Sequence, residues 1–353
     1  MAFAPDGTLF FTEKNTGAVR VIEDGRLRPE PFATVPSTGD AESGLLGIAL
    51  HPDYPAEPWV YLYYSSRETG TNLLVRTDGD RTETILEGLP VSPYHDGGDI
   101  AFGLDGMLYA VLGEAHDPGR AQDPDDLGGK IVRLTPEGEV PGDNPTPGSP
   151  VFSLGHRNSF GLCFDPFSGG LWETENGPSE HDEVNLILPR GNYGWPEASG
   201  PSEDERFVDP MIDFAQIVVP TGCAFYPERH LGPRSLGALF IGTYTGTLYR
   251  AELSHQRAFA IRHAPFLEGL PGITDVQVGP DGRLYLATDE SILRLPRRLR
   301  PAPEPGPTGA SPSPIETVPP QPGGELPWLP WAAAGAAITV GAAAWGWARA
   351  RRG

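Results

Sequence analysis

Three short segments of this 353-residue chain combine residue types that can do acid–base, anion-binding or metal chemistry. The first, residues 94–98 (YHDGG), leads directly into an apolar run that begins at Ile100. A histidine here lies on a loop at a strand start, beside glycines that let a ligand approach the backbone. Because histidine takes up a proton near neutral pH, His95 is a candidate general base. The other interpretation is a turn histidine bonded to the backbone.

The second segment, residues 155–158 (GHRN), precedes the strand-like run FGLCF at 160–164. Arg157 offers several N–H donors in a fixed planar fork, and Asn158 adds a donor and an acceptor. Such a pair suits an anionic or carbonyl-rich ligand. Alternatively, Arg157 pairs with one of the many acidic loops of the chain.

The third segment contains Glu183 and Tyr193, which stand on either side of the strand-like run VNLIL and the turn PRGN. Carboxylate and carbonyl oxygens that converge on such a corner match calcium, which takes about six to eight hard oxygen ligands. The acidic residues near Asp182 are equally consistent with a solvated loop. The spacing therefore makes this corner a candidate metal site and no more.

A recurring turn provides the elements that position these residues. The pattern is an apolar residue, a Pro-Asp-Gly type turn and an alternating apolar run, and it recurs at intervals of roughly 50 to 60 residues, the length of one four-stranded propeller blade. The copies begin at Phe3, Leu50, Phe102, Phe164, Phe225 and Val278. Six copies predict an all-β, six-bladed β-propeller, because a closed ring removes the sheet edges that so many strands would expose. The alternative is a β-sandwich whose hairpins happen to carry similar turns.

Composition agrees with a β-rich chain and excludes one class of partner. The chain has 45 Gly and 40 Pro, too many for a helical protein, and 39% hydrophobic residues, enough for a large core. Its formal net charge of −21 argues against nucleic acid, whose phosphates need basic patches. The two cysteines, Cys163 and Cys223, are expected to be small buried hydrophobic residues at similar places in neighbouring repeats, without a bridge between them.

The two ends of the chain suggest an exported protein. Met1 stands two residues before the first repeat, without a leader sequence ahead of it. We therefore expect the natural chain to begin upstream, with a further strand and an export signal. Upstream in-frame coding sequence that lacks a signal peptide would contradict this expectation.

The C-terminal region predicts a membrane anchor. We expect a propeller over residues 1–298, a Pro-rich linker over 299–326, a transmembrane helix over 327–348 and a basic cytoplasmic tail over 349–353. The predicted helix lacks charges and has tryptophans near both ends, and arginines follow it, so its C-terminal side should be cytoplasmic. The propeller would then lie outside the cytoplasm. A buried or amphipathic Ala-rich helix is the alternative.

Taken together, the motifs resemble the glucose/sorbosone dehydrogenase family, the soluble aldose sugar dehydrogenases that use pyrroloquinoline quinone (PQQ) on a six-bladed propeller. The resemblance covers about residues 1–296. Its motifs are SGLLGIALHPDY (43–54), HDGG (95–98), GKIVRL (129–134), GHRN (155–158), ENGPSEHDEVNL (175–186), GNYGWP (191–196) and VGPDGRLY (278–285).

The resemblance implies a role for each candidate residue. His95 would be the general base that removes the sugar hydroxyl proton, and Arg157 and Asn158 would hold the oxygens of PQQ, with Arg157 also stabilising developing charge. Glu183 and Tyr193 would bind calcium, Tyr193 through its backbone. Glu42 or Ser43 occupies the place of a cofactor-binding glutamine of the family.

Several expected cationic contacts to the cofactor are missing. Gly272 and Thr274 stand where members carry two arginines, and Lys14 and Lys130, the only lysines, both lie outside the fifth blade, where some members have one. Each lost charge-assisted hydrogen bond would cost about 1.5 to 3 kcal/mol. The candidates to compensate from nearby loops are Arg234, Arg250 and Arg262.

The leading interpretation is an exported, membrane-tethered quinoprotein that oxidises an aldose or a related sugar and passes electrons to a membrane quinone or cytochrome. The first alternative is a calcium-braced propeller that binds a glycan or protein and has lost the redox cofactor. A propeller lactonase, or another calcium-dependent hydrolase, fits the ordered motifs less well.

Overall fold

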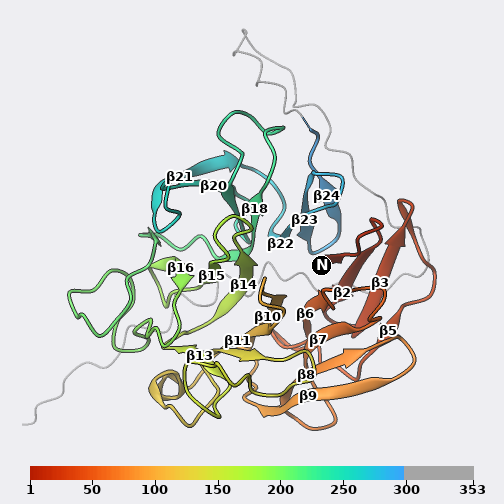
Figure 1. The fold of residues 1–353 in the computed structure, drawn as a ribbon, viewed down its shortest axis with the longest axis horizontal. Coiled ribbons are helices and arrows are strands. Elements are labelled where there is room, and N and C mark those ends of the chain that lie inside the picture. The colour runs from red at the N-terminus through yellow and green to blue at the C-terminus, as the bar shows by residue number, and fades with distance from the viewer. Residues whose placement is uncertain (298–353) are drawn as a thin grey trace, which may run out of the picture. The chain divides into compact units, whose positions relative to one another are not determined.

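The computed structural model describes residues 1–297, and the predicted linker, transmembrane helix and tail lie outside the described residues. Within residues 1–297 the chain forms six antiparallel sheets, each built from consecutive strands and arranged as blades around a common centre (Figure 1). The predicted six-bladed propeller is confirmed. No helix in this part of the chain has the length and apolar character needed to cross a membrane.

The blades follow one another in chain order. Blades 1 and 2 contain β1 (Ala2–Phe3), β2 (Leu9–Glu13), β3 (Ala18–Glu23), β4 (Arg26–Leu27), β5 (Ala33–Thr34), β6 (Leu45–Leu50), β7 (Val60–Ser65), β8 (Asn72–Thr77) and β9 (Thr82–Leu89). Blade 3 contains β10 (Gly97–Phe102), β11 (Leu108–Leu112), β12 (Lys130–Leu134) and β13 (Val151–Leu154), with a short 3-10 helix, Pro118–Gln122, before β12.

The second half of the ring repeats this arrangement. Blade 4 contains β14 (Ser159–Phe164), β15 (Leu171–Glu175), β16 (Asp182–Ile187) and β17 (Ile212–Phe214), and blade 5 contains β18 (Pro220–Tyr226), β19 (Ala238–Thr243), β20 (Leu248–Leu253) and β21 (Ala260–Leu267). Blade 6 has three strands among the described residues: β22 (Ile273–Val278), β23 (Leu284–Thr288) and β24 (Ile292–Arg294). The ring closes where the Phe3 ring packs on Tyr285, with ring centroids 4.7 Å apart.

The recurring turn forms the first hairpin of each blade. In four blades its aspartate accepts a hydrogen bond from the backbone N–H two residues later; these are Asp6, Asp105, Asp165 and Asp281. Asp105 and Asp281 also accept one from the tyrosine four residues later, at 3.0 and 3.1 Å. The turn therefore fixes both the hairpin and a side chain of the next strand.

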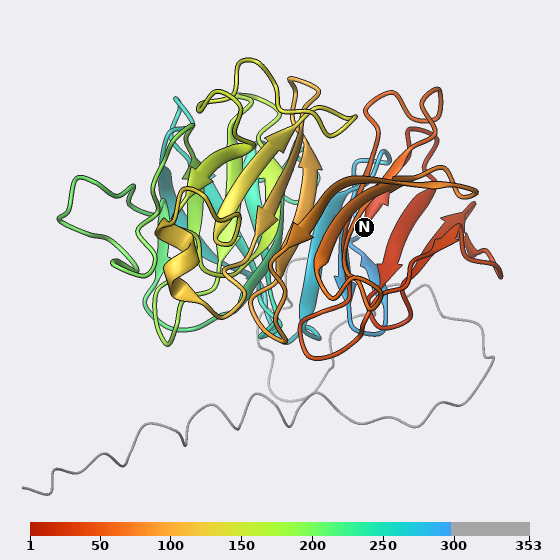
Figure 2. The ribbon, with the colours of Figure 1, turned by 90° about the horizontal axis from the view of Figure 1, so that it is seen from below.

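The hydrophobic core lies between blades. Five buried clusters join the blades that follow one another in the chain, from blades 1 and 2 to blades 5 and 6. Trp172, Tyr61 and Tyr226 are among the largest fully buried side chains. The blades thus pack face to face around the ring, as the side view shows (Figure 2).

The innermost strands of blades 2 to 6 share a further feature near their first residues. β6, β10, β14, β18 and β22 each show a register shift there against the next strand. Glycines at these bulges permit close packing: a Cβ on Gly47 would collide with the carbonyl of Gly98, and one on Gly161 with that of Thr221. Bulges often lie beside active sites, where they redirect the chain.

The prediction of unpaired cysteines was wrong. Cys163 on β14 and Cys223 on β18 form a disulfide, with Cα atoms 5.7 Å apart. The two strands are the innermost strands of blades 4 and 5, so the cysteines do occupy similar places in neighbouring repeats. The close approach of the inner strands brings them within bonding distance.

Candidate functional site

The predicted site residues come from the loops that precede three inner strands. Glu42 precedes β6, His95 precedes β10, and Arg157 and Asn158 precede β14. Because the inner strands run in the same direction around the ring, these loops meet at one end of the propeller. The structure brings all four residues together.

Glu42 ties the three loops to one another. Its Oε2 accepts a hydrogen bond from the backbone N–H of His95 at 2.7 Å and from Asn158 Nδ2 at 3.1 Å. Beside it, Lys14 Nζ donates to the carbonyl of Ala41 at 2.7 Å. The carboxylate at position 42 therefore acts as a structural acceptor at the site, next to a lysine that sequence reasoning had not placed there.

The imidazole of His95 lies between an acid and a guanidinium. Its Nδ1 is 2.7 Å from Glu114 Oε1, and its Nε2 is 3.0 Å from Arg157 Nη2. An ionised Glu114 can only accept, and Arg157 can only donate, so this geometry assigns the proton to Nδ1 and makes Nε2 the acceptor of the Arg157 N–H. Nε2 is thus the atom that can take up a proton.

The backbone at His95 is held in an unusual conformation. Its φ angle is +64°, in the left-handed region that few non-glycine residues adopt. The His95 carbonyl accepts the N–H of Ala115 at 2.9 Å, and a Cβ on Gly113 would collide with that carbonyl. Such backbone strain persists where the surrounding structure fixes it, most often at functional sites.

Arg157 is fixed by backbone carbonyls and lies among carboxylates. Its Nη1 donates to the carbonyls of Asn176 and Gly177 at 2.7 and 3.1 Å, and its guanidinium lies 5.2 Å from the centre of the Trp195 ring. Burial lowers the pKa of Arg157, whereas nearby Glu114, Glu175, Glu42 and Asp182 act to raise it. One guanidinium thus faces four acidic groups.

Several buried polar atoms around His95 and Arg157 find no partner within residues 1–297. They are Glu114 Oε2, Arg157 Nε, Asn158 Oδ1 and Trp195 Nε1. A buried polar atom without a hydrogen bond costs about 1 to 3 kcal/mol, so native proteins seldom leave several in one place. Two of these atoms are donors and two are acceptors, which points to a ligand that offers both oxygen acceptors and cationic or protic donors.

A second group of polar side chains, four of them ionisable, adjoins Arg157, whose backbone N–H donates to Glu175 Oε1 at 2.7 Å. We call it the acidic cluster, and it comprises His156, Glu173, Glu175, Glu183 and Asn185. The ligand-type atoms of His156, Glu173 and Glu175 all lie within 4.8 Å of one another, and these residues are buried. Asn185 Nδ2 joins Glu173 to Glu183, at 3.3 and 3.2 Å.

The strand register explains why the acidic cluster forms. Glu173 and Glu175 alternate along β15 and so face one side, as Glu183 and Asn185 do on β16. Glu175 pairs directly with Glu183 across the ladder. Like charges opposite one another destabilise a sheet, so this pair needs protons or a cation.

The ionisation of the cluster reflects this conflict. Burial raises the pKa of Glu175 to about 8, assisted by Glu173, and raises that of Glu183 to about 7. Although burial alone would lower the pKa of His156, the carboxylates of Glu173 and Glu175 raise it to about 10. At neutral pH His156 is therefore the cation of the cluster.

The predicted metal ligands border this cluster. Glu183 Oε1 accepts the N–H of Gly200 at 2.6 Å, and the Tyr193 ring stacks on His156 with centroids 4.7 Å apart. The Tyr193 hydroxyl is occupied by Leu186 and Leu188, which leaves its backbone as the group that could bind a metal. Calcium binding by Glu183 and Tyr193 stays a prediction.

Sequence reasoning missed Glu114, Glu173 and Glu175. Glu173 and Glu175 did carry a signal, since two carboxylates alternate on a short strand directly after the apolar Leu171 and Trp172. Glu114 carried none, because tertiary contacts bring it to the site: its backbone N–H donates to the carbonyl of Arg157, and the next residue, Ala115, donates to that of His95.

At the two positions of blade 6 where the resemblance predicts arginines, this chain has uncharged residues. Gly272 lies just before β22, where a Cβ would be 2.8 Å from the carbonyl oxygen of Tyr244, so a longer side chain would require a backbone shift. Thr274 lies within β22. Of the residues proposed to compensate, Arg234 and Arg250 lie within 4 Å of Glu252.

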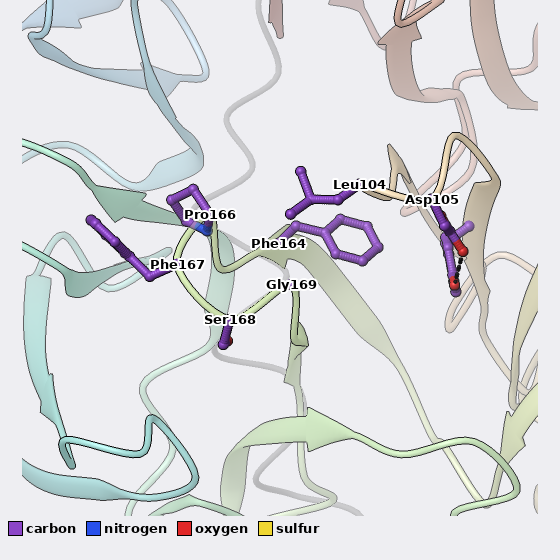
Figure 3. A pocket seen from close by; sticks show the side chains of 8 residues that line it. Leu104, Asp105, Phe164, Pro166, Phe167, Ser168 and Gly169 are labelled. Atoms are coloured by element: carbon purple, nitrogen blue, oxygen red, sulfur yellow. Dashed lines mark hydrogen bonds between the residues drawn. The ribbon is translucent and has the colours of Figure 1, made fainter.

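A cavity of about 540 Å³ lies elsewhere, at the other end of the inner strands. It is formed by the first hairpin turns of blades 3 and 4, and Figure 3 shows its lining, with Leu104 near Phe164. Its carboxylate, Asp105, is already bonded to Tyr109 and Arg133. Size alone therefore does not make it the chemical site.

Comparison with known proteins agrees with the site. A sequence model of the Glucose / Sorbosone dehydrogenase family matches residues 1–297. Aldose sugar dehydrogenase YliI of Escherichia coli (strain K12) is 31% identical over 322 residues, which cover 82% of this chain and 86% of that protein. Quinoprotein glucose dehydrogenase B of Acinetobacter calcoaceticus is 30% identical over 247 residues, or 59% of this chain and 52% of that protein.

A solved structure extends the likeness to three dimensions. The PQQ-bound aldose sugar dehydrogenase of Streptomyces coelicolor is 36% identical, with a TM-score of 0.73, over 82% of this chain and 87% of that chain. The resemblance seen in the motifs is thus confirmed over the whole propeller. The chain belongs to the glucose/sorbosone dehydrogenase family of sugar oxidoreductases.

Proposed function

We propose that this protein is a PQQ-dependent dehydrogenase that oxidises an aldose or a related sugar at the site around His95 and Arg157. The observation that carries the proposal is the set of unpartnered buried atoms on Glu114, Arg157, Asn158 and Trp195, within residues 1–297. They surround the one histidine whose Nε2 faces a guanidinium.

The residues present fit such a cofactor. Arg157 Nε and Trp195 Nε1 are buried donors that require acceptors, and a quinone with three carboxylates is rich in acceptor oxygens. Arg157, Asn158 and the loop of Glu42 would hold it. Bound PQQ would supply the two-electron oxidising equivalent that the side chains of the protein lack.

The chain's own residues would move the proton. His95 Nε2 would take the proton of the sugar hydroxyl, which would replace the Arg157 N–H as its partner. Glu114 would keep the other proton on Nδ1 and stabilise the imidazolium that forms. Arg157 would orient the ligand through Nε, which has no partner within residues 1–297. Glu114 is a positioning residue in this scheme, since it acts through His95.

Calcium is part of the proposal for an electrostatic reason. Four nearby carboxylates act to raise the pKa of Arg157, and Glu175 stands opposite Glu183 in the ladder. A divalent cation at Glu183 and the Tyr193 backbone would offset this excess negative charge. It would also allow an anionic cofactor to bind where Glu42, Gly272 and Thr274 replace the residues that members of the family use.

We further propose that the propeller is exported and tethered to the membrane. The disulfide Cys163–Cys223 supports export, because disulfides persist in oxidising compartments. The uncharged segment 327–348 supports a tether, with a membrane quinone or cytochrome as electron acceptor. Fractionation of cells that express the full chain, with protease added to intact cells, tests both statements. A protease-resistant protein in the cytoplasmic fraction would contradict them.

Reconstitution tests the catalytic proposal. The full 353-residue chain, loaded with PQQ and calcium, should reduce an electron-accepting dye when an aldose is added, and neither PQQ-free protein nor protein loaded with PQQ in a chelator should do so. Equilibrium dialysis measures PQQ binding in parallel. Failure to bind PQQ would overturn the proposal and favour the alternative, a binding propeller that keeps the same scaffold.

A further inference from the structure

A lysine is fully buried at the start of β12. Lys130 is one of the largest side chains of the propeller without exposed surface. Its Nζ donates to three backbone carbonyls, those of Arg120 at 2.7 Å, Ala121 at 3.2 Å and Gly128 at 2.8 Å. An ammonium has three N–H groups, so each of them has an acceptor. Lysine is almost never fully buried unless it is paired, and here its acceptors are neutral carbonyls.

The segment that Lys130 binds supports the loop before β14. The carbonyl of Ala121 also accepts the N–H of Gly155 at 3.0 Å, and the carbonyl of Gly129 accepts the N–H of His156 at 3.1 Å. The packing is close, because a Cβ on Gly129 would lie 2.5 Å from the carbonyl oxygen of His156. These two loop residues directly precede the arginine of the proposed site. Lys130 therefore fixes the support of the backbone that carries this arginine.

The same segment also holds Trp195. Gln122 donates through Nε2 to the carbonyl of Trp195 at 2.7 Å and to Asn192 Oδ1 at 2.9 Å. Its own Oε1 accepts from Asn192 Nδ2 at 2.8 Å. The Trp195 ring in turn lies 5.2 Å from the guanidinium of Arg157, measured from the ring centre. Two neighbouring groups of the proposed site thus depend on a segment whose carbonyls converge on Lys130.

The charged groups around Lys130 leave its proton weakly held. Burial lowers the pKa of Lys130 to about 8, although Asp126 and Asp123 act to raise it. The other charged groups of the adjoining loops are bonded elsewhere: Arg120 to Asp126, Glu114 to His95, and His156 to Glu175. The strand neighbours that pair with Lys130 are apolar, namely Leu112 and Leu154.

Loss of this proton would change the hydrogen bonding of the segment. A neutral amine has two N–H groups and one lone pair, so one of the three carbonyls would face a lone pair in place of a donor. A buried carbonyl without a donor is unfavourable, and its oxygen would be repelled by the lone pair. The segment would then have to move, and the loop before β14 would move with it.

We propose that Lys130 is a positioning residue, whose ammonium holds the loop of Arg157 and the Trp195 ring in the arrangement that binds the cofactor. Cofactor affinity should then fall at alkaline pH, when Lys130 loses its proton. The inference rests on the proposed function, because this arrangement matters for turnover only if PQQ binds beside Arg157. Lys130 itself would act from behind the ligand-binding groups, without contact to the ligand.

The proton on Lys130 can be measured directly, because the chain has only two lysines. Lysine labelled with ¹³C at Cε gives two NMR signals in the full chain, and the variant Lys14→Arg assigns them. The Lys130 signal should titrate with a midpoint near pH 8, well below the value of about 10.4 for an exposed lysine. A midpoint at or above that value would overturn the proposal.

Equilibrium dialysis at several pH values tests the coupling to PQQ, with calcium present. Lys130→Met keeps the apolar stem but removes the charge and all three donors. At pH ~7 its Kd for PQQ should be about tenfold higher than that of the wild type, as the loss of about one hydrogen bond predicts. The ratio should approach one at pH ~9.5, where the wild type has also lost the proton. A ratio that does not change with pH would overturn the proposal.

Arg133→Met is the matched control. Arg133 lies on the same strand, and its side chain is 8% exposed and paired with Asp105 and Asp143 at the other end of the blade. Its loss also removes a nearly buried cation from β12, but a guanidinium stays protonated throughout this pH range. The Kd ratio of this variant to the wild type should therefore not depend on pH. The same pH dependence as in Lys130→Met would assign the effect to general damage and contradict a specific role for Lys130.

Hydrogen exchange separates this proposal from the proposed function. If the chain binds no PQQ, the proposed function fails, but the link between Lys130 and the loop is still measurable in cofactor-free protein. The amides of Gly155 and His156 should exchange about tenfold faster in Lys130→Met than in the wild type at pH ~7, while those of β7 in another blade exchange equally. Equal exchange at Gly155 and His156 would overturn the proposal whatever the cofactor result.

The wild type alone decides if Lys130→Met does not fold. Protection of the Gly155 and His156 amides, corrected for the intrinsic pH dependence of exchange, should then fall between pH ~7 and pH ~9.5. Protection of β7 should stay constant over the same range. A constant protection at all of these amides would contradict the proposal.

Discussion

His156 and Arg157 are neighbours in the chain but belong to two different environments. His156 has both ring nitrogens bonded within a fully buried cluster, to Ser153 on one side and to Glu173 and Glu175 on the other. Arg157 faces the loops around His95, where four buried polar atoms lack partners within residues 1–297. The alternation of side chains at a strand start separates the two environments.

The difference indicates a division of labour. Both ring nitrogens of His156 find partners within the acidic cluster, so this histidine and its carboxylates should contribute chiefly to stability. The His95 side is incomplete without a ligand and should contribute chiefly to activity. The separation is not perfect, since Asn185 Oδ1 in the cluster also lacks a partner among the described residues. The four substitutions below test the separation.

The largest effect is expected from His95→Ala. Removal of a general base should lower kcat by about 10²- to 10⁴-fold, while PQQ affinity and thermal stability change little. Steady-state dye reduction and equilibrium dialysis measure the two quantities, with the exposed His255→Ala as the control. A large loss of PQQ affinity with kcat retained would instead give His95 a binding role.

In the acidic cluster, the substitution Glu173→Gln should lower the stability of the protein. Loss of a carboxylate from the buried His156 ion pair should lower the free energy of unfolding by about 3 to 5 kcal/mol, as for other broken buried pairs. Chemical denaturation measures it, and Glu180→Gln, an exposed glutamate on the following loop, is the matched control. If activity of the folded protein fell more than stability, the proposed division of labour would be wrong.

Asp99 has a carboxyl group without a histidine partner among residues 1–297, and burial changes its pKa. Burial, with Asp275 nearby, raises the pKa of Asp99 to about 7, above its ordinary value. A raised carboxyl pKa contributes stability that is present below the unfolded-state pKa and is lost as pH rises through about 7. Relative to Asp99→Asn, the wild type should lose about 2 to 4 kcal/mol between pH ~4 and pH ~8.

Denaturation curves at several pH values measure this difference. Asp80→Asn, an exposed aspartate, should leave the pH dependence of the wild type unchanged. A constant difference between wild type and Asp99→Asn across this range would show that Asp99 does not bind a proton on folding.

The smallest effect is expected from Glu42→Gln. This change keeps an acceptor for the His95 N–H but removes a negative charge beside the proposed site of a tricarboxylate. PQQ should bind about tenfold more tightly, or about 1.4 kcal/mol. Equilibrium dialysis shows whether the affinity for PQQ rises or falls. Weaker binding would mean that the charge of Glu42 is needed, for example to hold calcium.

The fold was readable from the sequence because each blade repeats one local signal. Asp105 and Asp281 form the same turn contacts in blades 3 and 6, so the periodic turn marked a real structural unit. The disulfide between Cys163 and Cys223 could not be predicted, because no local sequence pattern shows how closely two inner strands approach each other. Glycine bulges set that distance.

The site was readable only in part. The loops that carry His95 and Arg157 could be predicted, because their residue types suit chemistry and each loop directly precedes a strand. Glu114 lies 19 residues from His95 and reaches it only through tertiary contact. The structure places these groups together, and their chemical roles stay predictions for the experiments above.

The shared bulge of the five inner strands has an evolutionary consequence. Because each strand changes register near its start, the loop before it and the core-facing run after it obey separate side-chain patterns. Mutations in a loop, such as glutamate at position 42 or glycine at 272, therefore need not disturb the apolar alternation behind them. Ligand contacts at this end of the propeller can thus change while the packing of the strands behind them is kept.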